Sequence, residues 1–170
     1  MPDPAKPEEV LTPDDRRFRD VFGHFATGVT IITAMDGEEP VGMAANSFTS
    51  LSLDPPLVLF CVAHSSTTWP RIEQARRFAV NILGEEHEEL SRLFAQRGAD
   101  RFGSTPWHRG VSGSPVLDDA IAYIDCEFEA EHPGGDHKIV VGRVVDLDMR
   151  EGARPLLFFR GAYLRISATS

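Results

Sequence analysis

Two long runs of alternating apolar and polar residues flank a glycine-rich turn, and this feature constrains the fold more than any other. The runs are "AIAYIDCEFEAEH" (120–132) and "KIVVGRVVDLDM" (138–149), and "PGGD" separates them. Alternation with period two is typical of strands that bury one face, and paired glycines permit the tight turn of a hairpin. The sequence therefore predicts a long antiparallel hairpin near its C-terminal end.

Shorter segments rich in β-formers surround this hairpin. They are "VTIITA" (29–34), "VGMAANSFTSLS" (41–52), "PLVLFCVA" (56–63), "FAVNIL" (78–83) and "PLLFFRGAYLRI" (155–166). Many short strands with few β-α-β units favour an antiparallel β-barrel, closed or nearly closed, over a parallel sheet. A β-sandwich is the alternative, but a barrel accommodates the polar segment 41–52 more easily.

Three helices are expected between these strands. Residues 12–15 offer N-cap side chains ahead of "RRFRDVFGHFATG", where Phe18, Val21, Phe22 and Phe25 share one face. Gly28 is the expected end of this helix. The other two are "STTWPRIEQARRF" (66–78) and "EEHEELSRLFAQRG" (85–98), the second ending at a glycine. The loop that follows, "ADRFGSTPWHRGVSGSP", is long enough to suggest a functional role.

Length and charge narrow the class of protein. A chain of 170 residues fits one domain, and a net charge of -9 disfavours nucleic acid and anionic lipid as partners. Residues 1–13 are acidic and proline-rich, so we expect a flexible arm ahead of a domain at 14–168. Without a signal peptide or a long apolar run, the sequence predicts a cytoplasmic protein.

Cys61 and Cys126 lie in apolar runs and are expected to be free thiols, a disulfide being the alternative.

Small and neutral polar residues concentrate in the segment 41–52. Gly42, Ala44 and Ala45 leave space beside the backbone, while Asn46 and Ser47 supply donors and acceptors without charge. This combination suits a flat ligand with a polar edge. The alternative is a strand at a sheet edge that turns its polar side chains to water.

Two further clusters carry possible binding groups. The stretch from His64 to Thr68 places hydroxyls at a predicted helix start, where backbone N–H groups favour a phosphate. The alternative is an ordinary N-cap. His137 follows the predicted hairpin turn and is suited to contact an aromatic ligand, or else is simply solvated. The chain has no CxxC, HExxH, GxSxG, P-loop or GxGxxG motif, so neither a metal site nor a serine hydrolase is expected.

Taken in order, several of these segments resemble the short-chain flavin reductases, which are the reductase components of two-component flavin-dependent monooxygenases. The segments are "FRDVFGHFATGVTIITA", "PVGMAANSFTSLSLDPPLVLFCV", "SSTTW", "RFAVNIL", "GGDHKIVVGRV" and "PLLFFRGAY". The resemblance spans residues 18–163. It implies the FMN-binding split barrel, an antiparallel Greek-key β-barrel with helices, and a homodimer with flavin sites near the subunit interface.

The resemblance also implies roles for individual residues. Those expected along the isoalloxazine are Ala44, Ala45, Asn46 and Ser47; those near the ribityl chain or phosphate are Ser50, Leu51 and Ser52; Cys61 and Val62 line the ring or ribityl side; and Ser65, Ser66 and Thr67 hold the phosphate. Gly135, Asp136 and His137 match the nicotinamide-side motif, with His137 orienting the nicotinamide, and Phe102 is a weaker candidate for the pocket wall. Many relatives have Arg or Lys in the phosphate segment, whereas this chain has "VAHSST", which leaves the choice between FMN and FAD open.

The implied activity is that of an NAD(P)H:flavin oxidoreductase. Hydride passes from nicotinamide C4 to flavin N5, FMN or FAD is the flavin, and NADH or possibly NADPH is the donor. No residue is expected to act as an acid or base. The reduced flavin is expected to reach a partner monooxygenase by diffusion. The alternatives are an oxidase of the pyridoxamine-phosphate type and a flavin- or haem-binding module on the same barrel.

Overall fold

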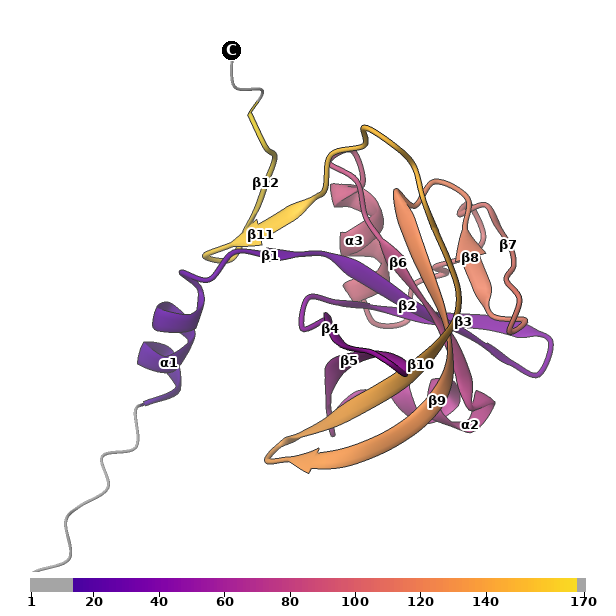
Figure 1. Cartoon of the computed structure of the whole chain (residues 1–170). Helices are drawn as coiled ribbons and strands as arrows, with labels where there is room; N and C mark the ends of the chain where they lie inside the picture. Colours follow the sequence, from indigo (N-terminus) through magenta and orange to yellow (C-terminus); the bar gives the residue numbers. More distant parts are fainter. Residues whose placement is uncertain (1–13, 168–170) are drawn as a thin grey trace, which may run out of the picture.

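The computed structural model describes residues 14–167, and their fold is predominantly β (Figure 1). The helices are α1 (Asp15–Phe22), α2 (Trp69–Ala75) and α3 (Glu88–Ala95). The strands are β1 (Thr27–Gly28), β2 (Thr30–Asp36), β3 (Glu39–Ala45), β4 (Thr49–Leu53), β5 (Pro56–Ala63), β6 (Arg77–Ile82), β7 (Trp107–Arg109), β8 (Pro115–Leu117), β9 (Ala122–Gly134), β10 (His137–Met149), β11 (Leu157–Phe159) and β12 (Ala162–Leu164). The arm predicted at residues 1–13 lies outside the described residues.

The main sheet has seven strands in the order β3-β2-β6-β9-β10-β5-β4, and every pairing is antiparallel. Its two edge strands, β3 and β4, are consecutive in the chain and are joined by residues 46–48 alone. Laid flat, the sheet would separate its edges by about 29 Å, whereas this connection spans at most about 15 Å. The sheet must therefore curl until its edges approach each other. The predicted mainly β, antiparallel split barrel is confirmed.

The long hairpin predicted from the alternating runs is also confirmed. β9 pairs with β10 from His137 opposite Gly134 to Met149 opposite Ala122. Residues 135–136 form the turn, and Gly135 has a positive φ of 72°, which glycine adopts without strain. The turn places His137 at the very start of β10.

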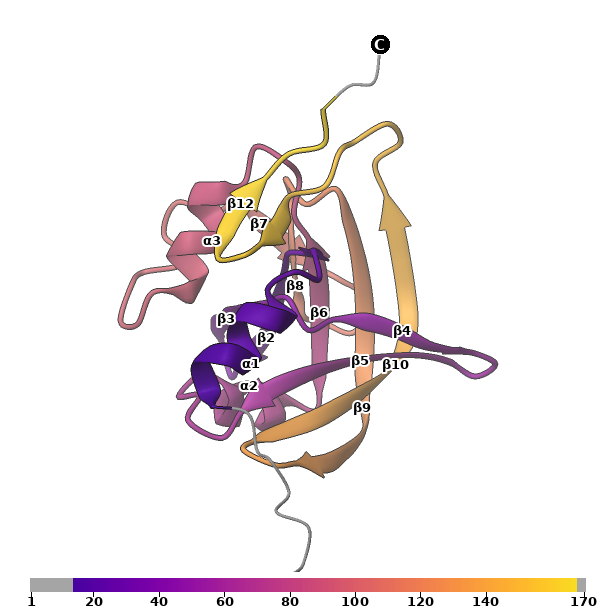
Figure 2. The same cartoon turned by 90° about the vertical axis from the view of Figure 1, so that its left-hand side faces the viewer.

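The segment 41–52 was predicted as one strand, and this is wrong. The chain leaves β3 after Ala45 and enters β4 at Thr49, at the opposite edge of the sheet. Gly42 was expected to leave space for a ligand, but the structure gives a different reason for a glycine here. An added Cβ would lie 2.9 Å from the ring of Phe94. β4 and β5 form a hairpin that projects from the body (Figure 2).

Two hydrophobic clusters fill the interior and share β2. Ile32 belongs to the cluster inside the curled sheet, where the Phe60 ring packs edge-on against Trp69 and Phe78. Ile31, on the opposite face of the strand, packs with Phe94 in the cluster beneath α3. Both faces of β2 are therefore buried, and this strand joins the two clusters.

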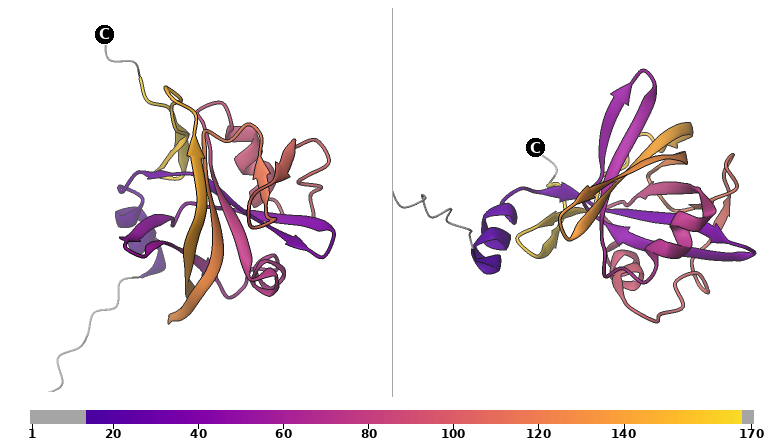
Figure 3. Two further views of the ribbon diagram at one scale, coloured as in Figure 1. Left: turned by 45° about the vertical axis from the view of Figure 1, so that its right-hand side comes forward. Right: turned by 90° about the horizontal axis from the view of Figure 1, so that it is seen from below.

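The first helix begins as predicted but ends early and lies apart from the body. The Asp14 carboxylate accepts a hydrogen bond from the Arg17 amide at 2.7 Å, which is an N-cap. The helix ends at Phe22 with Gly23 as its cap, so the expected end at Gly28 is wrong and Phe25 lies beyond the helix. None of its residues is buried, and Figure 3 shows α1 standing away from the sheet.

The two cysteines form no disulfide. Cys126 is fully buried, and burial raises the pKa of its thiol to about 12. Cys61 is half-buried. Within residues 14–167, no helix combines the length and the apolar character needed to cross a membrane.

Candidate functional site

A cavity of about 390 Å³ opens where the two edges of the curled sheet meet. Its wall is built from the end of β3 and the connection to β4, the end of β5, the segment before α2, the end of α3 with the loop after it, and the start of β10. The residues are Met43, Ala44, Ala45, Asn46, Ser47, Cys61, Val62, Ala63, Ser65, Ser66, Thr67, Thr68, Phe94, Ala95, Arg97, Arg101 and His137. This volume lies within the usual range for small-molecule sites.

The connection between the sheet edges is fixed by the Ser47 side chain. Its hydroxyl donates to the Cys61 carbonyl and accepts from the Cys61 amide, both at 2.9 Å. The Ser47 side chain thus makes the two bonds that the backbone of a paired strand residue would make. It makes them across the seam, which is the line where the two edges of the curled sheet approach each other. Since these bonds engage the Ser47 hydroxyl, the backbone and the Asn46 side chain, which is exposed, are the groups left for a ligand.

The hydroxyl-rich segment lies on the cavity wall, where its side chains have different contacts. The Ser66 hydroxyl accepts from the amide of Trp69, the first residue of α2, at 3.1 Å. The Thr68 hydroxyl accepts from Arg101 at 3.1 Å. Ser65 and Thr67 are exposed. An anion in the cavity would therefore meet Ser65 and Thr67 first.

His137 stands at the hairpin end of the cavity. His137 is half-buried, and its Nδ1 donates to the Asp136 carboxylate at 2.7 Å. This bond, the largest cause, holds the pKa of Asp136 below its usual value. The backbone N–H of His64 donates to the Asp136 carbonyl at 3.0 Å, which ties β5 to the hairpin turn. Because a carboxylate only accepts, the bond fixes the His137 ring with Nε2 as its remaining nitrogen.

Two arginines on the cavity wall were missed by the sequence analysis. Arg101 reaches in from the loop after α3, and its guanidinium donates to Gly42 O at 2.5 Å and Gln96 O at 2.7 Å. Arg97 is exposed, and no ion pair involves it within residues 14–167. The two arginines bring positive charge to a wall on which the segment "VAHSST" supplies neither Arg nor Lys. No sequence motif marks them, because they lie far along the chain from the strands they face.

The structure does not bring every predicted residue to this wall. Those on it are Ala44, Ala45, Asn46, Ser47, Cys61, Val62, Ser65, Ser66, Thr67 and His137; those off it are Ser50, Leu51, Ser52, Phe102, Gly135 and Asp136. Ser50 and Leu51 are exposed on the β4–β5 hairpin, and Ser52 is half-buried there. Phe102 packs edge-on against Phe94 and Trp107. Gly135 and Asp136 form the turn beside His137.

The arrangement suits binding rather than acid–base catalysis. A flat ring fits beside the small Ala44 and Ala45, neutral donors and acceptors lie at its edge, and cations stand at one end of the cavity. These groups match a flavin, whose chemistry resides in the cofactor and leaves the protein to bind and orient. The fold and cavity thus define a split-barrel protein with a pocket for a flat, anionic ligand.

Comparison with known proteins agrees with this class. The family model "Flavin reductase like domain" matches residues 22–167. A flavin-dependent monooxygenase reductase subunit, HsaB, from Rhodococcus jostii is 48% identical over 153 residues, covering 90% of this chain and 78% of the relative. The FMN reductase (NADH) SmoA from Agrobacterium fabrum is 41% identical over 163 residues, covering 94% and 92%.

A solved structure gives the same result. The Streptomyces globisporus NADH:FAD oxidoreductase SgcE6, in complex with NAD and FAD fragments, superposes with a TM-score of 0.87 at 39% identity. The match covers 96% of this chain and 99% of that one. The chain belongs to the flavin reductase-like family, which confirms the resemblance found in the sequence.

Proposed function

We propose that this protein is an NADH-dependent flavin reductase that supplies reduced flavin to a partner monooxygenase. The observation that carries the proposal is the cavity at the seam of the sheet, where segments far apart in sequence bring together a surface for a flat ring, neutral hydrogen-bonding groups and two arginines. Relatives named as reductase subunits and as NADH-dependent reductases of FMN or FAD support it.

In this proposal the protein's groups bind and orient. Ala44, Ala45 and the backbone up to Ser47 flank the flavin ring, with Asn46 at its polar edge. Cys61 and Val62 line the side of the ring or ribityl chain, while the hydroxyls of Ser65 and Thr67 face the phosphate. Bound flavin supplies the hydride-accepting chemistry, so no side chain of this chain needs to move a proton.

His137 holds the nicotinamide in the proposal. Its ring is oriented by Asp136, lies on the cavity wall, and presents Nε2 as the nitrogen free to hydrogen-bond. A fixed imidazole at this position restricts the pose of the second substrate over the ring, and correct orientation is the main contribution that a protein makes to hydride transfer. Gly135 serves indirectly, through the turn that brings His137 to the cavity.

A homodimer, a domain at residues 14–168 and a cytoplasmic location complete the proposal. The dimer is supported by apolar side chains that one chain leaves exposed on α1 and on the β4–β5 hairpin. They include Phe18, Val21, Phe22, Leu51 and Leu53, the last 95% exposed. Large apolar side chains exposed together on one element are a feature of interaction sites.

The test is the loss of NADH absorbance under air with riboflavin, FMN or FAD added in turn, and then with NADPH in place of NADH. A flavin reductase consumes NADH at a rate that saturates with flavin. A binding module retains flavin through purification and shows no turnover. An oxidase consumes oxygen with its own substrate and without added NADH. Either of the last two results would overturn the proposal.

A further inference from the structure

A second cavity, of about 580 Å³, adjoins the first. Thr67, Thr68 and Arg101 line both, so the two cavities are neighbours with Arg101 between them. The residues that line only the second cavity come from β3, α2 and the loop after α3, and are Glu39, Pro40, Val41, Gly42, Arg71, Gly98, Ala99, Asp100 and Phe102. The flavin proposal uses the first cavity alone and leaves this space without a role.

The junction between the two cavities carries a positive charge, that of Arg101, which forms no ion pair within the described residues. All the partners of Arg101 are neutral oxygens, namely the Gly42 and Gln96 carbonyls and the Thr68 hydroxyl. No carboxylate of residues 14–167 forms an ion pair with it. Its Nε is buried and lacks a hydrogen-bond partner in the described part of the chain. A half-buried guanidinium in this state attracts an anion, above all one that accepts several hydrogen bonds, such as a phosphate.

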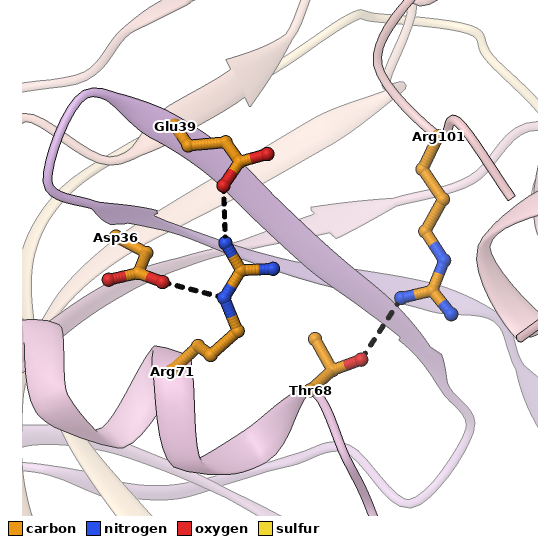
Figure 4. Close-up of polar contacts among 5 residues, drawn as sticks. All are labelled: Asp36, Glu39, Thr68, Arg71 and Arg101. Carbon is orange, nitrogen blue, oxygen red and sulfur yellow. Dashed lines mark hydrogen bonds and ion pairs between the residues drawn. The ribbon is translucent and has the colours of Figure 1, made fainter. Parts of the chain in front are cut away.

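The far wall of the second cavity has the opposite character. Arg71 donates to the Asp36 and Glu39 carboxylates, each at 2.6 Å, as Figure 4 shows. Two carboxylates outweigh one guanidinium, so this group repels phosphate. The two bonds also hold the Arg71 plane still, which makes it a suitable surface for stacking a neutral base. The remaining carboxylate oxygens can accept from hydroxyl or amino groups.

From the first cavity to the second, therefore, a site for a flat ring is followed by a cation and then by a surface of hydrogen-bond acceptors with a net negative charge. We propose that Arg101 binds the diphosphate, and the cavity beside Arg71 the adenosine, of a dinucleotide. This inference rests on the proposed function, since it extends the flavin site. FAD and NADH share this adenosine diphosphate half. Because the second cavity adjoins the flavin pocket across Arg101, FAD is the expected occupant, and the protein should prefer FAD to FMN.

Calorimetric titration of the wild-type protein gives the first test. We expect FAD to bind at least about fivefold more tightly than FMN, a gain of the size that one added well-placed contact provides. ADP should compete with FAD but bind together with riboflavin, which lacks the phosphate and adenosine. Equal affinity for FAD and FMN, or displacement of riboflavin by ADP, would overturn the inference.

Inhibition kinetics distinguish the two sources of the adenosine. With riboflavin as the flavin, ADP that inhibits competitively against NADH would assign the cavity to the nicotinamide coenzyme instead of FAD. ADP that inhibits only when FAD is the flavin would assign it to FAD. ADP without effect on either would contradict both assignments. Turnover with riboflavin needs only the first cavity, so it tests the proposed function independently of this inference.

Two variants test whether Arg101 binds the diphosphate and whether the second cavity binds the adenosine. Ala99→Phe adds a ring to the second cavity, and the ratio of the FMN and FAD dissociation constants should then fall to about one. Arg101→Gln removes the charge but keeps donors, and should raise the Kd for FAD about tenfold more than the Kd for riboflavin. Arg109→Ala is the matched control, because Arg109 is exposed, pairs with Glu38 and lines neither cavity. An unchanged preference for FAD in folded Ala99→Phe protein would refute the assignment.

Discussion

The Ser47 hydroxyl bonds both backbone groups of Cys61, donating to the carbonyl and accepting from the amide. This pair of bonds crosses the seam where the curled sheet nearly closes, and it fixes the connection between β3 and β4 over the cavity. A hydroxyl that satisfies two backbone groups in a partly buried position cannot be removed without leaving both unpaired.

Ser47→Ala should therefore lower the free energy of unfolding by about 1–2 kcal/mol and weaken flavin binding. Urea denaturation measures the first effect, and calorimetric titration the second. Ser50→Ala is the control for stability. Ser50 is exposed on the neighbouring strand, and its replacement should change the free energy of unfolding by less than about 0.5 kcal/mol. Equal stability of the two variants would show that the Ser47 bonds contribute nothing.

His137→Ala should raise the KM for NADH about fivefold to twentyfold, with a smaller change in the Kd for flavin. The reason is that the proposed contact of His137 is with the nicotinamide, while the proposed contacts of the flavin ring are with Ala44 and Ala45. Steady-state kinetics at saturating flavin give the KM, and titration gives the Kd. His132→Ala is the control, since His132 is exposed on the same hairpin and lies off the cavity wall. Unaltered NADH kinetics in His137→Ala would remove the assignment.

The sequence predicted those elements whose signal is local. Alternation over 120–132 and 138–149 with glycines between them located the β9–β10 hairpin, and the capping residues at 12–15 located the start of α1, whose N-cap is Asp14. The same reasoning took 41–52 as one strand, because no glycine or proline marks a break at residues 46–48, which in fact connect β3 to β4. What interrupts the strand is the bond between Ser47 and Cys61, a tertiary contact without a local signal.

The candidate site was predictable in part for the same reason. Resemblance to a family pointed to His137 and to the segments around residues 44–47, 61–62 and 65–67, all of which line the first cavity and lie in recognisable motifs. Arg101 lies 59 residues from Gly42, whose carbonyl it binds, and no periodicity connects the two. The second cavity depends on this contact and on the pairing of Arg71 with Asp36 and Glu39. Long-range contacts between loops and strands are set by the fold, so they emerge only once the fold is known.

Charge on the exposed face of α1 should dissociate the proposed homodimer. Phe18 and Phe22 are 52% and 61% exposed, and their ring centroids lie 4.4 Å apart. Since α1 has no buried residue, Phe18→Glu with Phe22→Glu should leave the fold of each chain intact while making a dimer contact unfavourable. Light scattering should give a dimer mass for the wild type and a monomer mass for the variant. Arg16→Glu, on the same helix, should remain dimeric; a monomeric wild type would contradict the proposal.

Tyr123 should make folding sensitive to alkaline pH. Its hydroxyl donates to the Asp146 carboxylate at 2.8 Å, and this bond, with lesser contributions from burial and nearby carboxylates, raises the pKa of Tyr123 from 10.0 to about 12. A raised pKa favours the neutral phenol in the folded state, so its contribution to stability is complete below pH 10.0 and is lost as the pH rises toward about 12.

Urea denaturation at several pH values checks this. Across the window from pH 10.0 to about 12, the wild type should lose stability more steeply than Tyr123→Phe, which has no proton to release. Spectrophotometric titration of the folded protein should show a tyrosine component with a pKa near 12 that is absent from the variant. Asp146→Asn, which removes the charge but keeps an acceptor, should bring the pKa of Tyr123 back toward 10.0, because the bond to a carboxylate is its main cause. Parallel pH profiles in the wild type and Tyr123→Phe would show that the bond to Asp146 is not maintained in solution.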